Sequence, residues 1–347
     1  MIELDPWWLE HLVCPVDKQR LEAHADGLRC ASGHSYRVVD GVPVMLLREW
    51  PQTISLAHAS LNRAENIGVD TRAPDLHLES LGISEDEKRR VVELSRQSSA
   101  IDPVVAFLIA ASNGLMYRHL IGALDRYPIP VLPLPRAEGK LLIDIGCSWG
   151  RWTFAANDAG YAAVGLDPSL GAVMAARRVA ASRGSRNRYV VGDARYLPFA
   201  EGTFDAAFSY SVLQHFPKTD AAAAITEIGR VLRRGGTAKV QLPTTRGLRC
   251  LYHQARRGFR EPVGFEVRYW EVAEIHRVMT KAIGQVTIDV DGYFGIGLQP
   301  ADRPFMTPTL RAILTASEAL KAISRGFRPL VTIADSVFAT ATRPAMP

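Results

Sequence analysis

The segment LLIDIGCSWGRW, residues 141–152, constrains the fold of this chain more than any other stretch. Strand-like residues, apolar except for Asp144, run into a turn that contains Gly146 and Gly150. Glycine adopts backbone angles that are closed to other residues, and a helix that begins after such a turn offers free amides to polar groups. Ligands of open parallel sheets bind at the carboxyl ends of strands. The segment therefore predicts a ligand-binding edge, although a tight turn without a ligand has the same glycine pattern.

Strand-like and helix-like segments alternate from residue 140 onward. The expected strands are 140–145, 161–167, 188–194, 203–211 and 237–242, and the expected helices are 151–160, 169–184 and 219–236. The tail is less regular, with helices near 270–283 and 308–325 and strands within 284–295 and 330–343. Nearly continuous apolar strands between helices predict an α/β fold whose parallel sheet is covered on both faces.

The chain changes character before residue 140. Residues 1–50 combine short strand-like runs with glycine turns and predict a small β-rich module. Residues 51–139 form the expected connector, with helical periodicity at 85–97 and 104–127 and a proline-dense spacer at 127–139. The third expected unit is 140–347, with an insertion near 244–272 that covers the substrate.

Composition limits the alternatives. A net charge of +5 permits an acidic or phosphate-bearing partner without requiring one. The four cysteines are too few and too scattered for a disulfide framework, and no secretory signal opens the chain. The longest apolar stretch, 104–116, is interrupted by Ser112, Asn113 and Gly114 and is too short for a bilayer span. We therefore expect a cytoplasmic protein without a membrane span.

Acidic side chains recur where successive strands end. Asp167 ends the second strand, where a carboxylate can accept hydrogen bonds from both ribose hydroxyls of a nucleoside. Asp193 and Ala194 end the third strand, where an adenine edge can be recognised. Together with Asp144 these acids predict one nucleoside site, since the carboxyl ends of parallel strands share an edge.

The block 140–243 resembles the S-adenosylmethionine-dependent class I methyltransferases, which have a seven-stranded Rossmann-like sheet. Ser148 replaces the middle glycine of that family's D/E-x-G-x-G-x-G motif. The resemblance implies these cofactor-binding residues: Asp144, Gly146, Cys147, Ser148, Gly150, Asp167, Pro168, Asp193, Ala194, Ser209 and Tyr210. A nicotinamide dehydrogenase is the rival, but the turn lacks the G-x-G-x-x-G spacing.

Methyl transfer from a sulfonium is an in-line displacement that mainly requires positioning, with a base only where the nucleophile must lose a proton. His215, just after the fourth strand, is the candidate base; a histidine on a helix surface is the alternative. The expected substrate-binding residues are Ser211, Arg256, Arg257 and Tyr269.

An arginine-rich segment with interleaved aromatic residues follows the fifth strand at 246–270. It favours a clamp for a phosphate- or carboxylate-bearing substrate, while a solvated basic helix is the alternative. We expect methyl transfer to an oxygen or nitrogen of a small molecule, a glycan or a lipid-linked acceptor. An rRNA or tRNA methyltransferase that uses the N-terminal module for substrate binding, and a non-catalytic cofactor-binding scaffold, are the alternatives.

Cys14, Asp17, Cys30 and His34 have the spacing of a zinc ribbon in which aspartate replaces one cysteine. Zinc accepts a carboxylate ligand, so a zinc site is a candidate, and a ribbon that has lost its metal is the alternative. The module resembles the small zinc-ribbon-like family that activates tRNA and protein methyltransferases as a partner subunit. Its ligand spacing is also similar to the zinc site of the large-subunit rRNA guanine methyltransferases.

Overall fold

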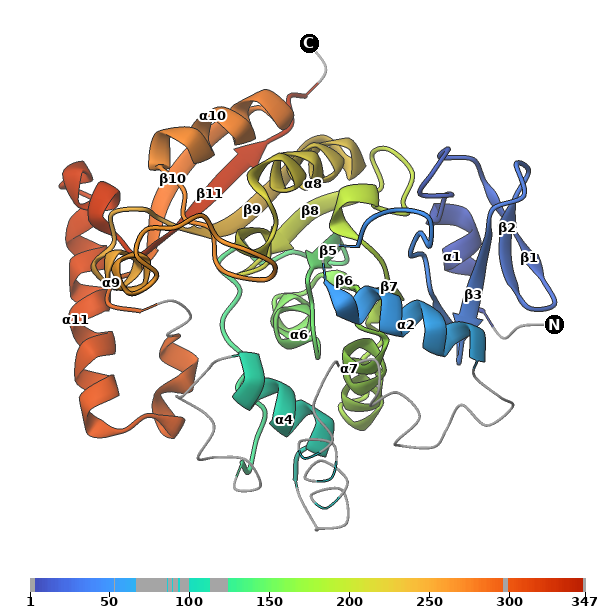
Figure 1. The fold of residues 1–347 in the computed structure, drawn as a ribbon, viewed down its shortest axis with the longest axis horizontal. Coiled ribbons are helices and arrows are strands. Elements are labelled where there is room, and N and C mark those ends of the chain that lie inside the picture. The colour runs from blue at the N-terminus through green and yellow to red at the C-terminus, as the bar shows by residue number, and fades with distance from the viewer. Residues whose placement is uncertain are drawn as a thin grey trace.

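The computed structural model describes residues 4–52, 54–66, 100–112, 124–295 and 299–345, with residues 86, 89 and 93. It contains a seven-stranded sheet and a separate four-stranded antiparallel sheet. Figure 1 shows the small sheet beside one edge of the large one. Within these residues no helix is both long enough and apolar enough to traverse a bilayer.

The large sheet has the strand order β10-β11-β9-β8-β5-β6-β7. Its strands are β5 (Leu141–Ile145), β6 (Ala162–Asp167), β7 (Arg188–Val191), β8 (Phe204–Ser209), β9 (Leu232–Pro243), β10 (Gln285–Gly292) and β11 (Ser336–Thr342). The strands β7, β6, β5, β8 and β9 run parallel, whereas β11 is antiparallel to both of its neighbours. This arrangement confirms the predicted Rossmann-like sheet, with mixed rather than purely parallel strands.

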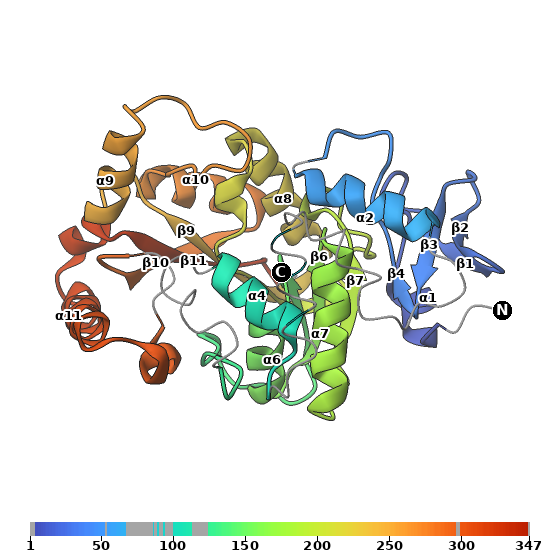
Figure 2. The same cartoon turned by 60° about the horizontal axis from the view of Figure 1, so that its bottom comes forward.

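Helices cover both faces of this sheet, as the near-continuous apolar strands require. On one face lie α4 (Pro103–Ser112), α6 (Arg151–Asp158) and α7 (Leu170–Ser182), with α2 (Ser55–Asn66) against α7. On the other face lie α8 (Lys218–Val231) and α10 (Val272–Ala282). Figure 2 shows these two layers from the side. The remaining helices of the C-terminal region are α9 (Leu248–Arg256) and α11 (Pro308–Ser324).

One predicted boundary is wrong. The helix expected at 219–236 ends at Val231, because Leu232 takes extended angles and pairs with Phe204 of β8. Gly235 and Gly236 therefore lie inside β9 rather than at a helix end. The last strand, β11, lies within the predicted range 330–343 and begins at Ser336, after the 3-10 turn η5 (Arg328–Ile333).

The N-terminal module contains α1 (Pro6–His11), β1 (Leu21–His24), β2 (Gly27–Cys30), β3 (Ser35–Val39) and β4 (Val42–Pro43). It lies at the β7 end of the large sheet (Figure 1), where Val44 forms a parallel bridge with Val191. Leu12 forms an antiparallel bridge with Phe199. These contacts cover the edge strand, and the apolar residues of the module divide between the buried cluster that contains α8 and α10 and the one that contains α4 and α7.

The three-unit division at 50 and 139 stays a prediction. Most of the helix predicted at 85–97, and residues 113–123 of the one predicted at 104–127, lie outside the described residues. The spacer at 127–139 has neither helix nor strand, as its prolines predict.

Candidate functional site

Asp144 anchors the helix that follows the glycine turn. Its side chain is buried, and Oδ2 accepts a 2.6 Å hydrogen bond from the Thr153 hydroxyl of α6. Burial, together with the nearby charge of Asp167, raises the pKa of Asp144 to about 7. The carboxyl group thus links the first turn of α6 to the end of β5, on either side of the glycine turn.

Asp167, the last residue of β6, connects that strand to the glycine turn at 146–150. Its Oδ2 accepts a hydrogen bond of 2.9 Å from the amide of Ser148, and its Oδ1 accepts one of 2.9 Å from the amide of Ser169. The amides of Gly146 and Cys147 both donate to the carbonyl of Leu166, at 2.7 and 3.0 Å. Burial raises the pKa of Asp167 to about 6. The predicted residues at these two strand ends therefore converge.

Gly146 and Ser148 occupy left-handed backbone conformations, with φ of +76° and +48°. A Cβ on Gly146 would overlap the side chain of Val212, so the turn also approaches the loop after β8 too closely for a larger residue. Gly150, at φ +88°, lets α6 begin beside Tyr189. Cys147 is buried, and burial raises the pKa of its thiol well above the usual value, so this residue packs inside the turn.

Asp193, at the end of β7, is buried and ion-paired. Its carboxylate receives hydrogen bonds from Nε and Nη2 of Arg195, the shortest 2.7 Å, and one of 2.9 Å from the Arg195 amide. Arg195 also donates to Asp220 at 2.9 Å. Asp193 thereby holds the turn that carries Ala194, while Pro168 follows Asp167 on the neighbouring strand end.

The end of β8 is tied to both flanking strands. The hydroxyl of Ser209 donates to the carbonyl of Ile145 on β5 at 3.2 Å. The amide and hydroxyl of Ser211, whose φ is +58°, donate to Oε1 of Gln241 on β9 at 2.9 and 3.1 Å. Gln241 is buried, and its Nε2 has no hydrogen-bond partner among the described residues. It is an unpredicted donor beside the predicted Ser211.

Tyr210 is held by the C-terminal part of the domain. Its hydroxyl lies 3.0 Å from Oδ2 of Asp291 on β10 and accepts a hydrogen bond of 2.7 Å from Nε2 of Gln299. Its ring centroid is 4.8 Å from that of Trp152 in α6. Tyr210 thus connects the helix after the glycine turn with the last two strands.

The ring of His215 stacks on Phe265, with centroids 3.9 Å apart, and its Nδ1 is 2.7 Å from the Phe265 carbonyl. A carbonyl can only accept, which assigns the proton to Nδ1 and leaves Nε2 as the acceptor of a 3.2 Å hydrogen bond from Gln214. Burial lowers the pKa of His215, and the nearby charge of Arg268 lowers it further. The imidazole is therefore neutral near pH 7, with its lone pair on Nε2.

A cavity of about 550 Å³ lies beside this histidine, under the loop that follows α9. Four of its lining residues are cationic and two are aromatic: Lys218, Arg257, Arg260, Arg268, Phe259 and Tyr269. The guanidinium of Arg268 donates to the backbone carbonyl of His215 at 2.9 Å, although the imidazole is not among the groups that line the cavity.

Of the predicted substrate residues, Arg257 and Tyr269 line this cavity, whereas Arg256 lies over the exposed ring of Tyr252, 5.8 Å from its centroid. Lys218 and Arg268 were not predicted. Lys218 follows His215 closely in the chain, and Arg268 stands near the end of the arginine-rich segment. These positions could have identified both residues as candidates.

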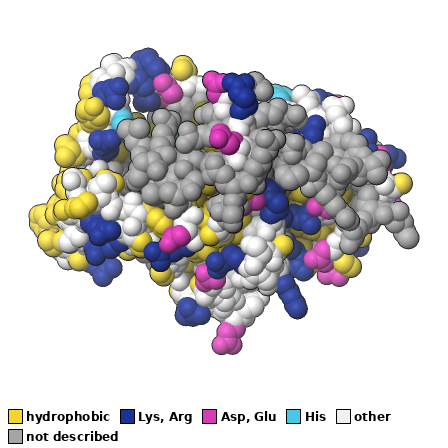
Figure 3. Space-filling model, turned by 90° about the horizontal axis from the view of Figure 1, so that it is seen from below, with side chains coloured by type: hydrophobic (Ala, Val, Ile, Leu, Met, Phe, Trp, Pro, Cys, Tyr) yellow, Lys and Arg dark blue, Asp and Glu magenta, His cyan; other side chains and the backbone are white. Residues whose placement is uncertain are grey.

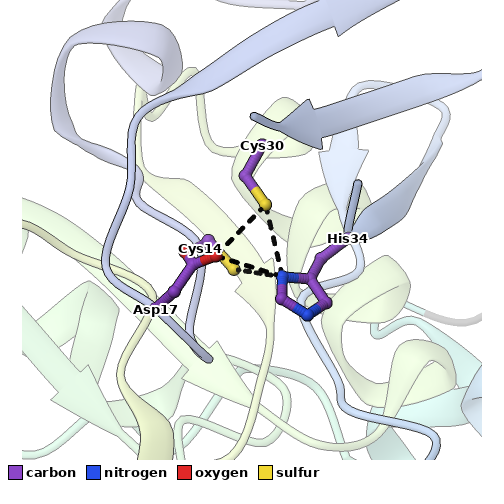
Figure 4. A group of neighbouring side chains, drawn as sticks. All are labelled: Cys14, Asp17, Cys30 and His34. Atoms are coloured by element: carbon purple, nitrogen blue, oxygen red, sulfur yellow. Dashed lines mark hydrogen bonds and ion pairs between the residues drawn. The ribbon is translucent and has the colours of Figure 1, made fainter. Parts of the chain in front are cut away.

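Cys14, Asp17, Cys30 and His34 gather in the N-terminal module (Figure 4). Their candidate ligand atoms all lie within 4.8 Å of one another. Nδ1 of His34 lies 3.5 Å from Sγ of Cys14, 3.3 Å from Sγ of Cys30 and 3.2 Å from Oδ2 of Asp17. Two thiols, an imidazole and a carboxylate at this spacing form a donor set that fits tetrahedral zinc.

Residues 142–236 match the family described as "Methyltransferase domain". A demethylmenaquinone methyltransferase of Corynebacterium kroppenstedtii is 38% identical over 103 residues, 29% of this chain and 41% of that protein. An uncharacterised methyltransferase of Mycolicibacterium paratuberculosis is 34% identical over 102 residues, 29% of this chain and 38% of that protein. The chain thus spans about two fifths of the length of these relatives.

Among solved structures, a complex between the Haloferax volcanii Trm112 methyltransferase activator and a methyltransferase aligns with a TM-score of 0.45 and 19% identity. That alignment covers 76% of this chain and 98% of the other. The family match and the strand order together define the larger unit. The chain contains a class I S-adenosylmethionine-dependent methyltransferase domain, joined to an N-terminal antiparallel β module with a Cys/His cluster.

Proposed function

We propose that this protein transfers the methyl group of S-adenosylmethionine to an oxygen or nitrogen of an anionic acceptor that is a small molecule, a glycan or a lipid-linked compound. The observation that carries this proposal is the cavity lined by Lys218, Arg257, Arg260 and Arg268. One of the relatives is named a demethylmenaquinone methyltransferase, which also favours a non-polymeric acceptor.

The residues of the glycine turn fit the proposed cofactor. Each Asp167 oxygen accepts only one backbone hydrogen bond, so lone pairs remain for the two ribose hydroxyls. The assignment of Ala194 to the adenine edge is supported by its position on the turn after Asp193, whose carboxylate is paired with Arg195. When bound, S-adenosylmethionine supplies an activated methyl group, and the chain's own contribution is to orient it and its acceptor.

Arg257 is the cation of the cavity best placed to receive an anion. Arg260 is paired with Glu266 at 2.6 Å, and Lys218 is paired with Glu274 at 2.6 Å. Arg257 stands 4.0 Å from Glu266, and its buried Nε has no partner among the residues that the structure describes. A planar guanidinium with a free donor suits a carboxylate or phosphate, and Tyr269 offers a ring face in the same cavity.

His215 would accept the proton of a hydroxyl or amine acceptor at Nε2. Its neutral imidazole already has the correct tautomer, because the Phe265 carbonyl holds the proton on Nδ1. The amide of Gln214 occupies that lone pair, so the acceptor's hydrogen bond would replace the one from Gln214.

RNA is the competing acceptor. On the face shown in Figure 3, the described Lys and Arg side chains are interspersed with Asp and Glu instead of forming one basic stripe. A nucleic-acid surface typically concentrates its positive charge. The cavity of about 550 Å³ and the absence of such a stripe on this face therefore support the smaller acceptor.

The test uses methyl-labelled S-adenosylmethionine with separate small-molecule, lipid, polysaccharide and RNA fractions of a cell extract. We expect label in one of the first three, lost in Arg257→Gln and retained in Arg256→Gln, the neighbouring arginine outside the cavity. Label in RNA alone would contradict the proposal. Tight cofactor binding with no labelled fraction would favour the non-catalytic scaffold.

We also propose that the N-terminal module binds a structural Zn²⁺ through Cys14, Asp17, Cys30 and His34. Tyr36 supports this set, since its hydroxyl lies 3.1 Å from the Cys14 sulfur. Elemental analysis of the purified protein should find about one zinc per chain, lost in Cys14→Ser and kept in Cys250→Ser. Cys250 is a matched control because it is a free, buried cysteine elsewhere. Equal metal content in the two variants would contradict the assignment.

A further inference from the structure

Arg151 is a buried charge at the glycine turn that the functions proposed above do not use. It is the first residue of α6, directly after Gly150. Only 10% of its side chain is exposed, and its ion-pair partner Asp302, on the 3-10 turn η4 (Pro300–Phe305), has none exposed. Charged side chains buried to this extent are costly unless all of their hydrogen-bonding groups are satisfied.

The pair satisfies only part of the guanidinium. Nη2 of Arg151 donates to both carboxylate oxygens of Asp302, at 2.7 and 2.9 Å. Nε is buried and has no hydrogen-bond partner within the described ranges. One donor of a fixed, oriented cation thus lacks an acceptor, which is the arrangement expected of a residue whose anionic ligand is absent.

The surroundings of Arg151 identify the part of the site that it serves. Trp152, the next residue, packs on Tyr210 at the end of β8. The positive charge of Arg151 also acts on the Tyr210 hydroxyl, where it opposes the burial that raises the pKa of that group. Arg151 therefore lies next to the glycine turn and close enough to the end of β8 to act on Tyr210, whereas Asp167 and Ala194 are the residues assigned to the ribose and adenine.

We propose that Arg151 binds the carboxylate of the methionine half of the cofactor and that Asp302 is the positioning residue that orients it. This inference rests on the proposed cofactor. A carboxylate matches the free donor in charge and geometry, and the buried Asp302 contact fixes the guanidinium before the ligand arrives. A carboxylate on the methyl acceptor has the same chemistry, and the experiment separates these two sources.

The experiment compares two probes by calorimetric titration. S-Adenosylhomocysteine carries the amino-acid carboxylate, whereas 5′-methylthioadenosine shares the nucleoside and lacks it. For Arg151→Met we expect roughly tenfold to hundredfold weaker binding of S-adenosylhomocysteine, the loss of one charged hydrogen-bonded contact, with 5′-methylthioadenosine unchanged. Asp302→Asn should shift the affinity ratio of the two probes in the same direction by a smaller factor.

Controls address folding. Arg178→Met removes an arginine of α7 whose Nε is paired with Asp102 at 2.7 Å, and it should leave the ratio of the two affinities at its wild-type value. The double variant Arg151→Met/Asp302→Asn removes both charges, so it keeps the test valid if the single variant unfolds. We expect the double variant to show the same selective loss as Arg151→Met.

Three outcomes would overturn the inference. Equal weakening of both probes would mean that Arg151 only shapes the turn. Unchanged affinities for both probes in folded Arg151 variants would exclude the cofactor carboxylate and leave the acceptor as the source. If the wild-type protein binds neither probe, the proposed cofactor itself is wrong, and the failure is distinguishable from the other two.

Discussion

The close approach of Gly146 to Val212 makes a quantitative prediction, with Gly139 as its matched control. Both glycines have positive φ, +76° and +71°, so alanine at either position incurs a left-handed backbone penalty of about 1–2 kcal/mol. A Cβ at 139 would meet nothing within 4 Å. At 146 it would overlap Cγ2 of Val212 and lie 2.8 Å from Cγ1, and such overpacking adds about 1–3 kcal/mol.

We therefore expect Gly139→Ala to lower the free energy of unfolding by about 1–2 kcal/mol and Gly146→Ala by about 2–5 kcal/mol. Urea unfolding followed by tryptophan fluorescence measures both values. Gly146→Ala should also weaken S-adenosylmethionine binding, because Val212 leads into the loop that carries His215. Adding Val212→Ala should recover part of both losses. Equal destabilisation of the two variants with unchanged cofactor affinity would refute this reasoning.

Two further predictions concern titration. If His215 is the base, kcat/KM should fall on acidification with an apparent pKa below the usual 6.5, because burial disfavours the charged imidazole. His215→Asn should abolish this acidic limb of the pH profile. An acidic limb that survives the substitution would assign the base to another residue. Asp144 has a folded-state pKa of about 7 against a usual 3.8, so between these values the folded state binds more protons and loses stability as the pH rises. Asp144→Asn, which can still accept from Thr153, should flatten the dependence of the unfolding free energy on pH over that window, and an identical slope would contradict the assignment.

Local sequence patterns predicted the elements that position the site. The alternation of apolar strands with helices gave β5 to β9, and the glycine spacing gave the turn at 146–150. The end of the helix at Val231 was mispredicted because Leu232 pairs with Phe204 of β8, a contact between residues far apart in the chain. A glycine pair after a helical run looks the same whether it ends a helix or lies inside a strand.

Most of the side-chain partners at the site could not be predicted from the sequence. Asp302 is 151 residues from Arg151, and Asp291 is 81 residues from Tyr210, so no local spacing connects them. The ligand cluster of the N-terminal module was accessible because Cys14 and His34 lie only 20 residues apart, beside the strands of one small module. Ligands in the turns of a small module have a recognisable spacing, whereas contacts across the domain depend on the whole fold.

The central claim is that acidic residues at successive strand ends serve one adenosyl cofactor, with Asp167 on its ribose. Calorimetric titration of S-adenosylmethionine into the wild-type protein, Asp167→Ala and the exposed-strand control Asp289→Ala tests it most directly. We predict binding by the wild type and the control, and at least about tenfold weaker binding, roughly 1.4 kcal/mol, for Asp167→Ala. Equal affinities for all three proteins would contradict the account.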